Sequence, residues 1–420
     1  MEFGKRFLEA RLAAGLTQAE LAAGLVTPGY ISHIEVGKRV PGKKIISVLS
    51  SRLGVDLEQY LDHPDSDKSD FELAQIQFLV TNGDFEKALK LIEQIEIGSN
   101  KSIYALHRAR FLKSVIQNNS GNLDSAISIL SHLFDETRKI SLRSEIAIEL
   151  LRAYRNNDEI QYGVAKGEEF LRLAKSEIWP KADLITLICQ IANLLLISGN
   201  QKRALDLANQ AKVLTEEFKD PRSISQAHWV ASSIFNKQGD FAKSAEQMEI
   251  AVKFAEIAEL NSRMPIMKND LAMQLLHGTR AEVTEGIRLA ENAFLEASIR
   301  ELVIIQISSA ETLFKCYFKL GDIEKAKSYL ETAEKISLEN HGIDSQVISY
   351  SKAKLQFHFD NDLETLFKEF ATAASMQQMF KHDVMLEWRF LANEAKKQGN
   401  FEIATHALEQ ALNIQVQLGV

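Results

Sequence analysis

Cysteine and histidine are the residues whose spacing most directly indicates metal binding or nucleophilic catalysis, and here it predicts neither. The 420-residue chain has two cysteines, Cys189 and Cys316, which lie far apart and form no paired motif. Its ten histidines are scattered, and single histidines on helices are more often structural or solvated than ligands. Cys189 could act as a nucleophile, but no base partner can be identified. Phosphate-cradling glycine loops, H-E-x-x-H and nucleophile elbows are also missing, so we expect neither an enzyme nor a cofactor.

The length of 420 residues points to two or three domains or to one long repeat array, and the composition to a soluble cytoplasmic protein. Apolar residues make up 45% of the chain and charged residues 25%, which is ordinary for such proteins. The two cysteines fit reduced thiols in a core or a groove. There is no run of about 18 apolar residues and no hydrophobic leader, so we expect no contact with a membrane.

The charge is unevenly distributed along the chain. The net charge is −8, yet residues 1–61 hold eight Lys/Arg and six Asp/Glu, a balance of +2 that leaves −10 for the remainder. Any contact with nucleic acid therefore belongs to the first 61 residues.

Residues 1–61 are expected to form five short helices. The first runs over about Phe3–Ala14. Thr17 then starts a capping box with Glu20, and Thr27 can cap a third helix that begins at Pro28, where the missing N–H costs nothing. An amphipathic helix through Ile45–Leu53 and a last short helix, capped by Asp56 and ending at Leu61, complete the expected set.

These residues resemble the Cro/repressor-type helix-turn-helix domain, or XRE family. The matching residues are Arg11, GLTQAELA (15–22), YISHIE (30–35), Gly37, Arg39 and Pro41. The resemblance implies a second helix at 17–24 and a recognition helix at 28–36 in the DNA major groove. It also implies an internal Arg11–Glu35 ion pair and a phosphate contact from Gln18.

The chain departs from the family at Pro28, where many relatives carry an amide that reads a base edge. Direct reading of bases then falls to Thr27, Tyr30, Ser32 and His33. Better placed for phosphate contacts are Lys38, Arg39, Lys43 and Lys44. The alternative is that Tyr30 and His33 only pack or face solvent, and that the basic loop is a solvated face.

A boundary is expected at residues 62–70, DHPDSDKSD, whose four Asp, one Pro and two Ser predict an acidic linker. Beyond it, at 71–420, the chain repeats a phrase of Gly–Asp/Asn with Ala five residues after the Gly. The phrase occurs at 83–88, 121–126, 199–204, 321–326 and 399–404, with a near copy at 239–245. The period is near 39–40, and the intervening turns are predicted at 156–162, 277–286 and 360–366.

The repeated phrase has a physical explanation. Gly allows the backbone to bend after one helix, Asp or Asn caps the next, and the small Ala lets the two helices approach. This pattern resembles tetratricopeptide repeats and predicts a right-handed α-solenoid of about nine helical hairpins. HEAT-type repeats have this length but lack the turn phrase, and they remain the alternative.

The whole all-α architecture resembles the RRNPP group, the cytoplasmic peptide-pheromone receptors of Gram-positive bacteria. That resemblance implies a quorum-sensing transcription regulator, generally a homodimer, that binds double-stranded operator DNA and a short signalling peptide in the concave groove of its repeats. Groove candidates lie about 3, 6 and 10 residues before a turn Gly, on one helix face. They are Asn193, Trp229, Ser233, Asn236, Glu311, Lys315, Phe318, Arg389, Asn393 and Lys396, with Cys189 also in register.

Other interpretations remain open at this point. Trp229 can equally be a core residue, and the asparagines can be merely solvated. The repeats can bind another protein or only dimerise, without a peptide ligand. A third possibility, known for some receptors of this group, is an array that also captures a second regulatory protein when the peptide is bound.

Overall fold

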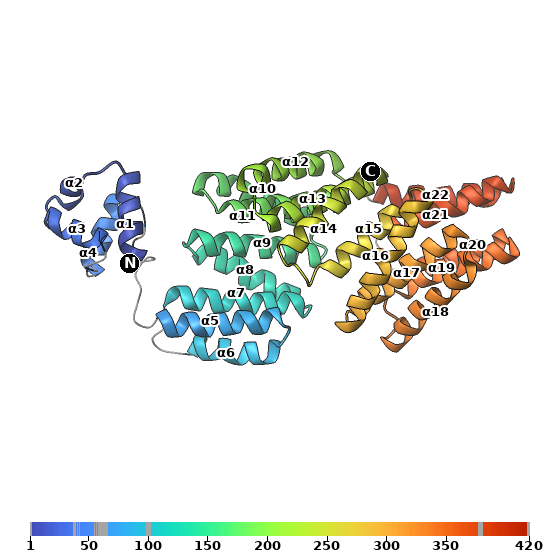
Figure 1. The fold of residues 1–420 in the computed structure, drawn as a ribbon, viewed down its shortest axis with the longest axis horizontal. Coiled ribbons are helices and arrows are strands. Elements are labelled where there is room, and N and C mark those ends of the chain that lie inside the picture. The colour runs from blue at the N-terminus through green and yellow to red at the C-terminus, as the bar shows by residue number, and fades with distance from the viewer. Residues whose placement is uncertain are drawn as a thin grey trace. The chain divides into compact units, whose positions relative to one another are not determined.

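The computed structural model describes residues 2–36, 39, 41, 43–53, 55, 57, 66–97, 102–376 and 381–417. The side chains of residues 2, 5, 6, 43, 44, 47, 66–70, 381–383 and 417 are not described. Throughout these ranges the chain forms helices and no strand, so the predicted all-α class is confirmed (Figure 1). The backbone divides into two compact units, Met1–Ala153 and Tyr154–Val420, and each is described by itself.

Within its described residues, the N-terminal domain of unit 1 contains four helices. They are α1 (Glu2–Ala13), α2 (Gln18–Ala22), α3 (Pro28–Glu35) and α4 (Lys43–Leu53). Their shared core includes Phe3, Phe7, Leu21, Ile31, Ile34, Ile46 and Leu49. The fifth helix expected at 56–61 falls almost wholly outside the described residues. Of the predicted linker at 62–70, residues 66–70 belong to α5, which begins at Ser66, and residues 62–65 lie outside the described residues.

The remaining helices form hairpins, each with a first and a second helix. Unit 1 holds α5 (Ser66–Thr81), α6 (Phe85–Ile97), α7 (Ile103–Asn119), α8 (Leu123–Glu136) and most of α9 (Ile140–Asn156). Unit 2 continues with α10 (Ile160–Glu177), α11 (Lys181–Ile197), α12 (Gln201–Phe218), α13 (Pro221–Lys237), α14 (Phe241–Ile257), α15 (Met264–Leu275) and α16 (Arg280–Ile299). It ends with α17 (Val303–Leu320), α18 (Ile323–Glu339), α19 (Ser345–Asp360), α20 (Leu363–Ala374), α21 (Lys381–Lys397) and α22 (Phe401–Gln417).

The predicted repeat period is confirmed by the starts of the first helices. In unit 2, Lys181, Pro221, Met264 and Val303 lie 40, 43 and 39 residues apart. The described residues of the array contain nine hairpins, and the turns predicted at 156–162, 277–286 and 360–366 all separate a first helix from a second.

The turn phrase works as its chemistry suggests. Gly321 ends α17 in the left-handed conformation with φ of 81°, which a glycine adopts without steric cost. The Asp322 side chain then accepts a hydrogen bond from the backbone N–H of Lys325 and caps α18. Ala326 is fully buried between the helices of the hairpin.

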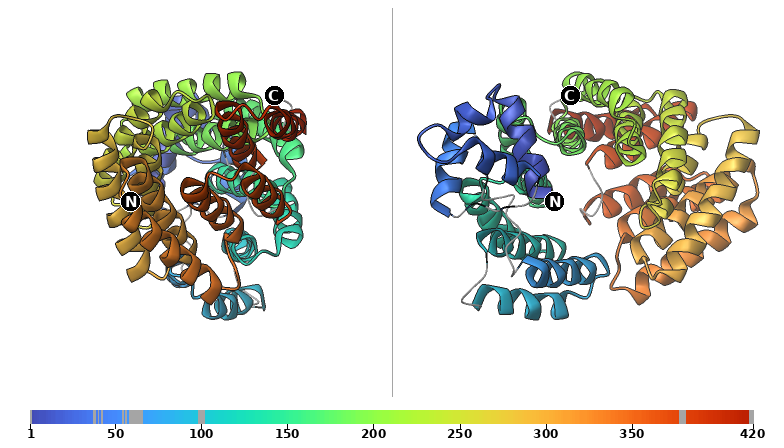
Figure 2. Two further views of the ribbon diagram at one scale, coloured as in Figure 1. Left: turned by 90° about the vertical axis from the view of Figure 1, so that its right-hand side faces the viewer. Right: turned by 60° about the vertical axis from the view of Figure 1, so that its left-hand side comes forward.

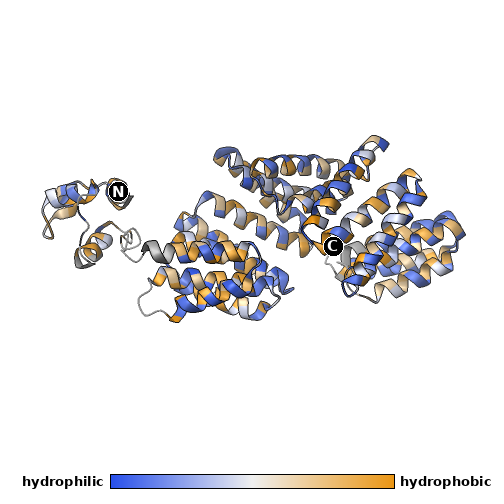
Figure 3. Ribbon diagram, turned by 60° about the horizontal axis from the view of Figure 1, so that its bottom comes forward, coloured by the Kyte–Doolittle hydropathy of each residue, from blue (hydrophilic) through white to orange (hydrophobic). Residues whose placement is uncertain are grey.

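Neighbouring hairpins bury their apolar faces against each other. In unit 2 consecutive hairpins lie side by side (Figure 2), and contacts join first helices directly, α11 to α13 and α15 to α17. Apolar and polar residues alternate along the helices, as expected when one face of each packs and the other meets solvent (Figure 3). The predicted groove residues lie on four of these first helices, α11, α13, α17 and α21.

Candidate nucleic-acid interface and repeat groove

Two predicted helix caps position the helix-turn-helix. The Thr17 hydroxyl accepts from the backbone N–H of Glu20 at 3.2 Å, and the Glu20 carboxylate accepts from the backbone N–H of Thr17 at 2.7 Å. Thr27 caps α3 by accepting from the backbone N–H of Tyr30 at 3.3 Å. The N-termini of α2 and α3 are therefore both fixed by local hydrogen bonds that the sequence predicted.

A buried polar network ties α1, α2 and α3 together. Arg11 Nε donates to Glu35 Oε1 at 2.5 Å, and Arg11 Nη1 donates to the Leu16 carbonyl at 2.7 Å. Arg11 is only 8% exposed, so its charge is neutralised inside the domain. The other oxygen of Glu35 accepts from Gln18 Nε2 at 2.6 Å. The Arg11–Glu35 pair implied by the family resemblance is present, and Gln18 is held by Glu35 in the same network.

The outward side of α3 carries few polar groups at its start. Ile31 and Ile34 face the core, while Pro28, Gly29 and His33 are exposed. Tyr30 and Ser32 are half-buried beside them, so the predicted base-reading residues Thr27, Tyr30, Ser32 and His33 all keep some surface exposure.

A stacked cation lies next to this surface. The Arg39 guanidinium carbon sits 4.7 Å from the centroid of the Tyr30 ring, within cation–π range. Of the other basic residues predicted to meet phosphates, Lys38 lies outside the described residues. Lys43 and Lys44 open α4, and their side chains are not described.

On α13 the groove candidates divide between packing and exposure. Trp229 is half-buried against a core cluster, and its Nε1 donates to Asp270 Oδ2 of α15 at 3.2 Å. Ser233 donates to the Trp229 carbonyl at 3.1 Å. Asn236 is exposed, and Asn193 on α11 is half-buried. Cys189 is in the same register and is fully buried. Of the core and groove placements predicted for it, it therefore has the core one.

On α17 the three candidates differ in how far they are buried. Glu311 is only 2% exposed, and its carboxylate pairs with Lys315 Nζ at 3.1 Å. The Phe318 ring packs edge-on against His358 of α19, with centroids 5.2 Å apart. Lys315 therefore keeps the surface position, while Glu311 and Phe318 take part mainly in packing.

On α21 the candidates Arg389, Asn393 and Lys396 are all exposed. Arg389 Nη2 also donates to Gln415 Oε1 of α22 at 3.2 Å. This part of the array presents two cations and one amide to solvent.

Side-chain contacts join successive first helices, and the sequence did not predict them. Thr186 of α11 donates to Gln226 of α13 at 3.2 Å, and Asn269 of α15 donates to Ser308 of α17 at 2.9 Å. Trp229–Asp270 joins α13 to α15, and an ion pair between Lys354 and Glu387 joins α19 to α21. These contacts link neighbouring repeats through their first helices, several of which carry groove candidates.

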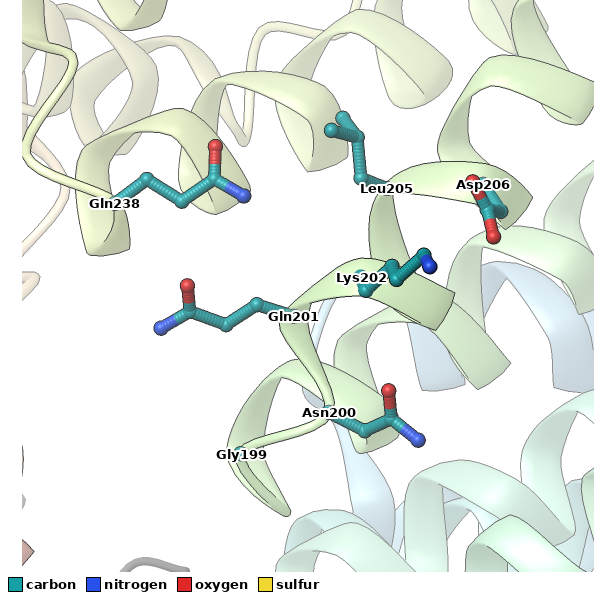
Figure 4. A pocket seen from close by; sticks show the side chains of 7 residues that line it. All are labelled: Gly199, Asn200, Gln201, Lys202, Leu205, Asp206 and Gln238. Atoms are coloured by element: carbon teal, nitrogen blue, oxygen red, sulfur yellow. The ribbon is translucent and has the colours of Figure 1, made fainter. Parts of the chain in front are cut away.

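A small hollow of about 480 Å³ opens elsewhere in unit 2, at the turn before α12 (Figure 4). Gly199, Asn200, Gln201, Lys202, Leu205, Asp206 and Gln238 line it. Its lining includes none of the predicted groove residues, so it is a separate surface feature.

Burial makes the thiols poor nucleophiles. It raises the pKa of Cys189 to about 12 and that of Cys316 to about 11, which keeps both protonated near neutral pH. Among the described residues no cluster of His, Cys, Asp or Glu is arranged to hold a metal ion. In the same part of the chain, no helix is long and apolar enough to cross a membrane.

Comparison with known proteins supports both halves of this architecture. A helix-turn-helix family model matches residues 8–60, and a tetratricopeptide-repeat model matches residues 315–340, which span the turn between α17 and α18. No curated protein matches the chain in sequence. The chain thus carries an XRE-type helix-turn-helix domain and tetratricopeptide repeats, as the sequence resemblance predicted.

Two solved structures show the fold of the larger part of the chain. A Rap protein complexed with competence and sporulation factor superposes with a TM-score of 0.62 at 13% identity, covering 84% of this chain and 99% of the other. The apo form of the quorum sensor NprR from B. thuringiensis gives 0.57 at 9% identity, covering 83% and 99%. At these identities the likeness establishes that the larger part of the chain shares the fold of these two proteins.

Proposed function

We propose that the chain is a cytoplasmic transcription regulator that binds operator DNA through α2 and α3 and responds to a short signalling peptide held by its repeats. The observation that carries the proposal is the pairing of a helix-turn-helix domain with an array that shares the fold of a quorum sensor. The other fold relative was solved with a bound signalling factor, which supports a ligand role for such an array. Two chains acting as a homodimer would place two such domains on paired half-sites.

At the DNA, the proposal gives base reading to Thr27, Tyr30, Ser32 and His33. Phosphate contacts fall to Lys38, Arg39, Lys43 and Lys44, because cations fix position without specifying sequence. Gln18 is assigned a phosphate contact through the part of its amide that Glu35 leaves free. Pro28 and Gly29 offer no side-chain hydrogen bond to a base. We therefore expect a single helix-turn-helix domain to bind DNA weakly, and sequence specificity to depend on the pairing of two such domains.

In the array, the exposed Asn236 and Asn393 are best suited to a peptide backbone, because each amide can both donate and accept. Lys315, Arg389 and Lys396 would contact acidic groups, including a terminal carboxylate. Asn193, Ser233, Trp229 and Phe318 would supply the walls, and Glu311 would hold Lys315 in place. The site proposed is the surface formed by the first helices of unit 2.

The proposed control of DNA binding by the peptide acts through the side-chain contacts between first helices. A peptide that binds one curvature of the array more tightly than another shifts the population toward it, and only that difference in affinity can do so. The hydrogen bonds Trp229–Asp270 and Asn269–Ser308 connect adjacent repeats, so a change of curvature would alter them. The spacing of the two DNA-binding domains would change in consequence.

The proposal is tested by following DNA binding during peptide titration. Labelled fragments from upstream of the gene would be bound by the full chain, with synthetic peptides encoded by short neighbouring reading frames as ligands. We expect at least one peptide to change both the DNA affinity and the melting temperature. The variant Asn236→Ala/Asn393→Ala should lose that response, whereas Asn413→Ala, an exposed amide on α22, should keep it.

Two outcomes contradict separate parts of the proposal. If no peptide changes melting temperature, DNA affinity or sedimentation, peptide control is wrong, and the array serves a partner protein or dimerisation alone. If no fragment is bound with a salt-dependent affinity, the DNA assignment fails irrespective of the peptide.

A further inference from the structure

Helix α2 is too short to hold its own position. It has five residues, Gln18–Ala22, whereas an isolated helix needs about 12 or more to be stable in water. Its Leu21 side chain is fully buried in the core of the domain. The position of α2 also decides where α3 begins, because only the short turn at 23–26 separates it from the Thr27 cap.

Two guanidinium groups from other helices hold the main chain of α2 at its two ends. Arg11 Nη1 of α1 donates to the Leu16 carbonyl, just before the Thr17 cap, at 2.7 Å. Arg52 Nη1 of α4 donates to the Leu21 carbonyl at 2.6 Å. The Leu21 carbonyl belongs to the last turn of α2, where a helix supplies no partner of its own. Arg52 therefore satisfies the main chain at the point where α2 leads into the turn.

The turn that follows α2 is fixed by its own hydrogen bonds. The backbone N–H groups of Leu25 and Val26 both donate to the Ala22 carbonyl, at 2.9 and 3.0 Å. Gly24 adopts the left-handed conformation with φ of 66°, which a glycine does without steric cost. A shift of the Leu21 carbonyl would therefore be transmitted through this turn to the start of α3.

We propose that Arg52 is a positioning residue for DNA recognition. By holding the Leu21 carbonyl it fixes the turn that places the first residues of α3 against the bases. The inference rests on the proposed function, in which Thr27 and Tyr30 read bases, and it gives Arg52 a role that the sequence did not indicate. Arg52 acts through α3 and touches no base itself.

Position and chemistry separate this role from a phosphate contact. Arg52 lies nine residues after Lys43, about 13 Å along α4, whereas the proposed phosphate contacts of α4 lie in its first turn. The guanidinium donates to a neutral carbonyl of the chain itself. A hydrogen bond to such an acceptor releases no counterion when DNA binds, so its loss should leave the salt dependence of binding unchanged.

Binding of the full chain to two DNA fragments tests the assignment. One fragment carries the sequence that the wild type selects from a random library, and the other is a scrambled fragment of equal length. Arg52→Met removes the charge and the donors but keeps a long side chain. We expect it to bind the selected fragment at least about fivefold more weakly, to bind the scrambled one like the wild type, and to keep the slope of log affinity against log salt.

Two further variants calibrate this result. Arg52→Lys keeps a donor of similar reach and should recover part of the lost preference for the selected fragment. Arg288→Met, which replaces an exposed arginine of α16, is the matched control and should bind both fragments like the wild type. Amide hydrogen exchange of Leu25 and Val26, measured without DNA, should be faster in Arg52→Met than in either.

The salt slope and the ratio of the two affinities decide between the roles of Arg52. Equal losses on both fragments with a slope reduced by about 1 make Arg52 a phosphate contact and overturn the proposal. An unchanged affinity ratio in a folded Arg52→Met, with only a lower melting temperature, leaves a merely stabilising bond and overturns it too.

Circular dichroism shows whether each variant is folded. If Arg52→Met is misfolded, Arg52→Gln gives the same test, because its shorter side chain should not hold the Leu21 carbonyl and should show the same loss of preference. A wild type that binds no fragment with a salt-dependent affinity refutes the proposed function itself. A wild type that discriminates between the fragments, with folded variants that discriminate equally well, refutes this inference alone.

Discussion

The indole of Trp229 donates a hydrogen bond to the carboxylate of Asp270, and this contact joins the first helices of two successive hairpins, α13 and α15. Trp229 also packs against the core cluster between them, so its side chain is both a wall of the array and a link along it. Burial raises the pKa of Asp270 to about 6, although the hydrogen bond from Trp229 acts to lower it.

The raised pKa predicts a pH dependence of stability. Between about pH 4 and 6 the folded chain keeps a proton on Asp270 that the unfolded chain has lost. The contribution of this proton to the stability of the folded chain is therefore complete below pH 4 and is lost as pH rises to 6. Relative to Asp270→Asn, the free energy of unfolding of the wild type should fall by about 3 kcal/mol across this window. Melting curves of both proteins from pH 4 to 7 measure the difference, and parallel pH profiles would contradict it.

The Arg11–Glu35 pair should dominate the stability of the N-terminal domain. Arg11→Met leaves the buried Glu35 carboxylate with only Gln18 as a partner, and breaking such a pair costs about 3 kcal/mol or more. Amide hydrogen exchange in α1, α2 and α3 should accelerate, while exchange in unit 2 stays unchanged. The double variant Arg11→Met/Glu35→Leu should recover part of the loss; a double variant as unstable as the single one would argue against a buried charge as the cause.

The local features of the fold were predictable from sequence because they depend on neighbouring residues. The Thr17 and Thr27 caps need only residues three positions away, and the turn phrase at Gly321 specifies both a bend and a cap. The repeat period follows from the recurrence of that phrase. These signals fixed the fold class and the boundaries of most hairpins.

Contacts between repeats were not predictable in the same way. Asn269 and Ser308 are 39 residues apart, and nothing in either local sequence specifies the partner. Helix α11 is almost uniformly apolar, so its sequence could not show whether Cys189 faces the core or the groove. On α17 the helical register of the groove candidates could not show that Glu311 is buried, at 2% exposed.

Two glycines should respond in opposite ways to the same substitution. A Cβ at Gly29, at the start of α3, meets no atom within 4 Å, so Gly29→Ala should stabilise the N-terminal domain by about 0.5 kcal/mol through the lower entropy of its unfolded chain. A Cβ at Gly286 lies 3.1 Å from the Ala272 carbonyl oxygen, because α16 approaches the backbone of α15 there. Gly286→Ala should destabilise that hairpin by about 1 kcal/mol.

Local hydrogen exchange distinguishes the two glycine effects, since the chain has more than one unit and need not unfold in a single step. Slower exchange in α3 is expected for Gly29→Ala, and faster exchange in α15 and α16 for Gly286→Ala. Stabilisation by both replacements would show that α16 can move away from Ala272 without loss.

Salt dependence tests the phosphate contacts most directly. Arg39→Ala should weaken binding to all DNA sequences and reduce the slope of log affinity against log salt by about 1, because one fewer counterion is released. Lys43→Ala/Lys44→Ala should reduce it by about 2. Lys327→Ala, an exposed lysine of α18, should leave the slope unchanged.

The stacking of Arg39 on Tyr30 adds a finer test of the same surface. Tyr30→Phe keeps the ring that orients the guanidinium, so the salt slope should be preserved and any loss should fall on sequences read through the hydroxyl. Tyr30→Ala removes the ring, so affinity should fall for every sequence as Arg39 loses its fixed position. Equal losses for Phe and Ala would assign the contribution of Tyr30 to its hydroxyl alone and remove the stack from the mechanism.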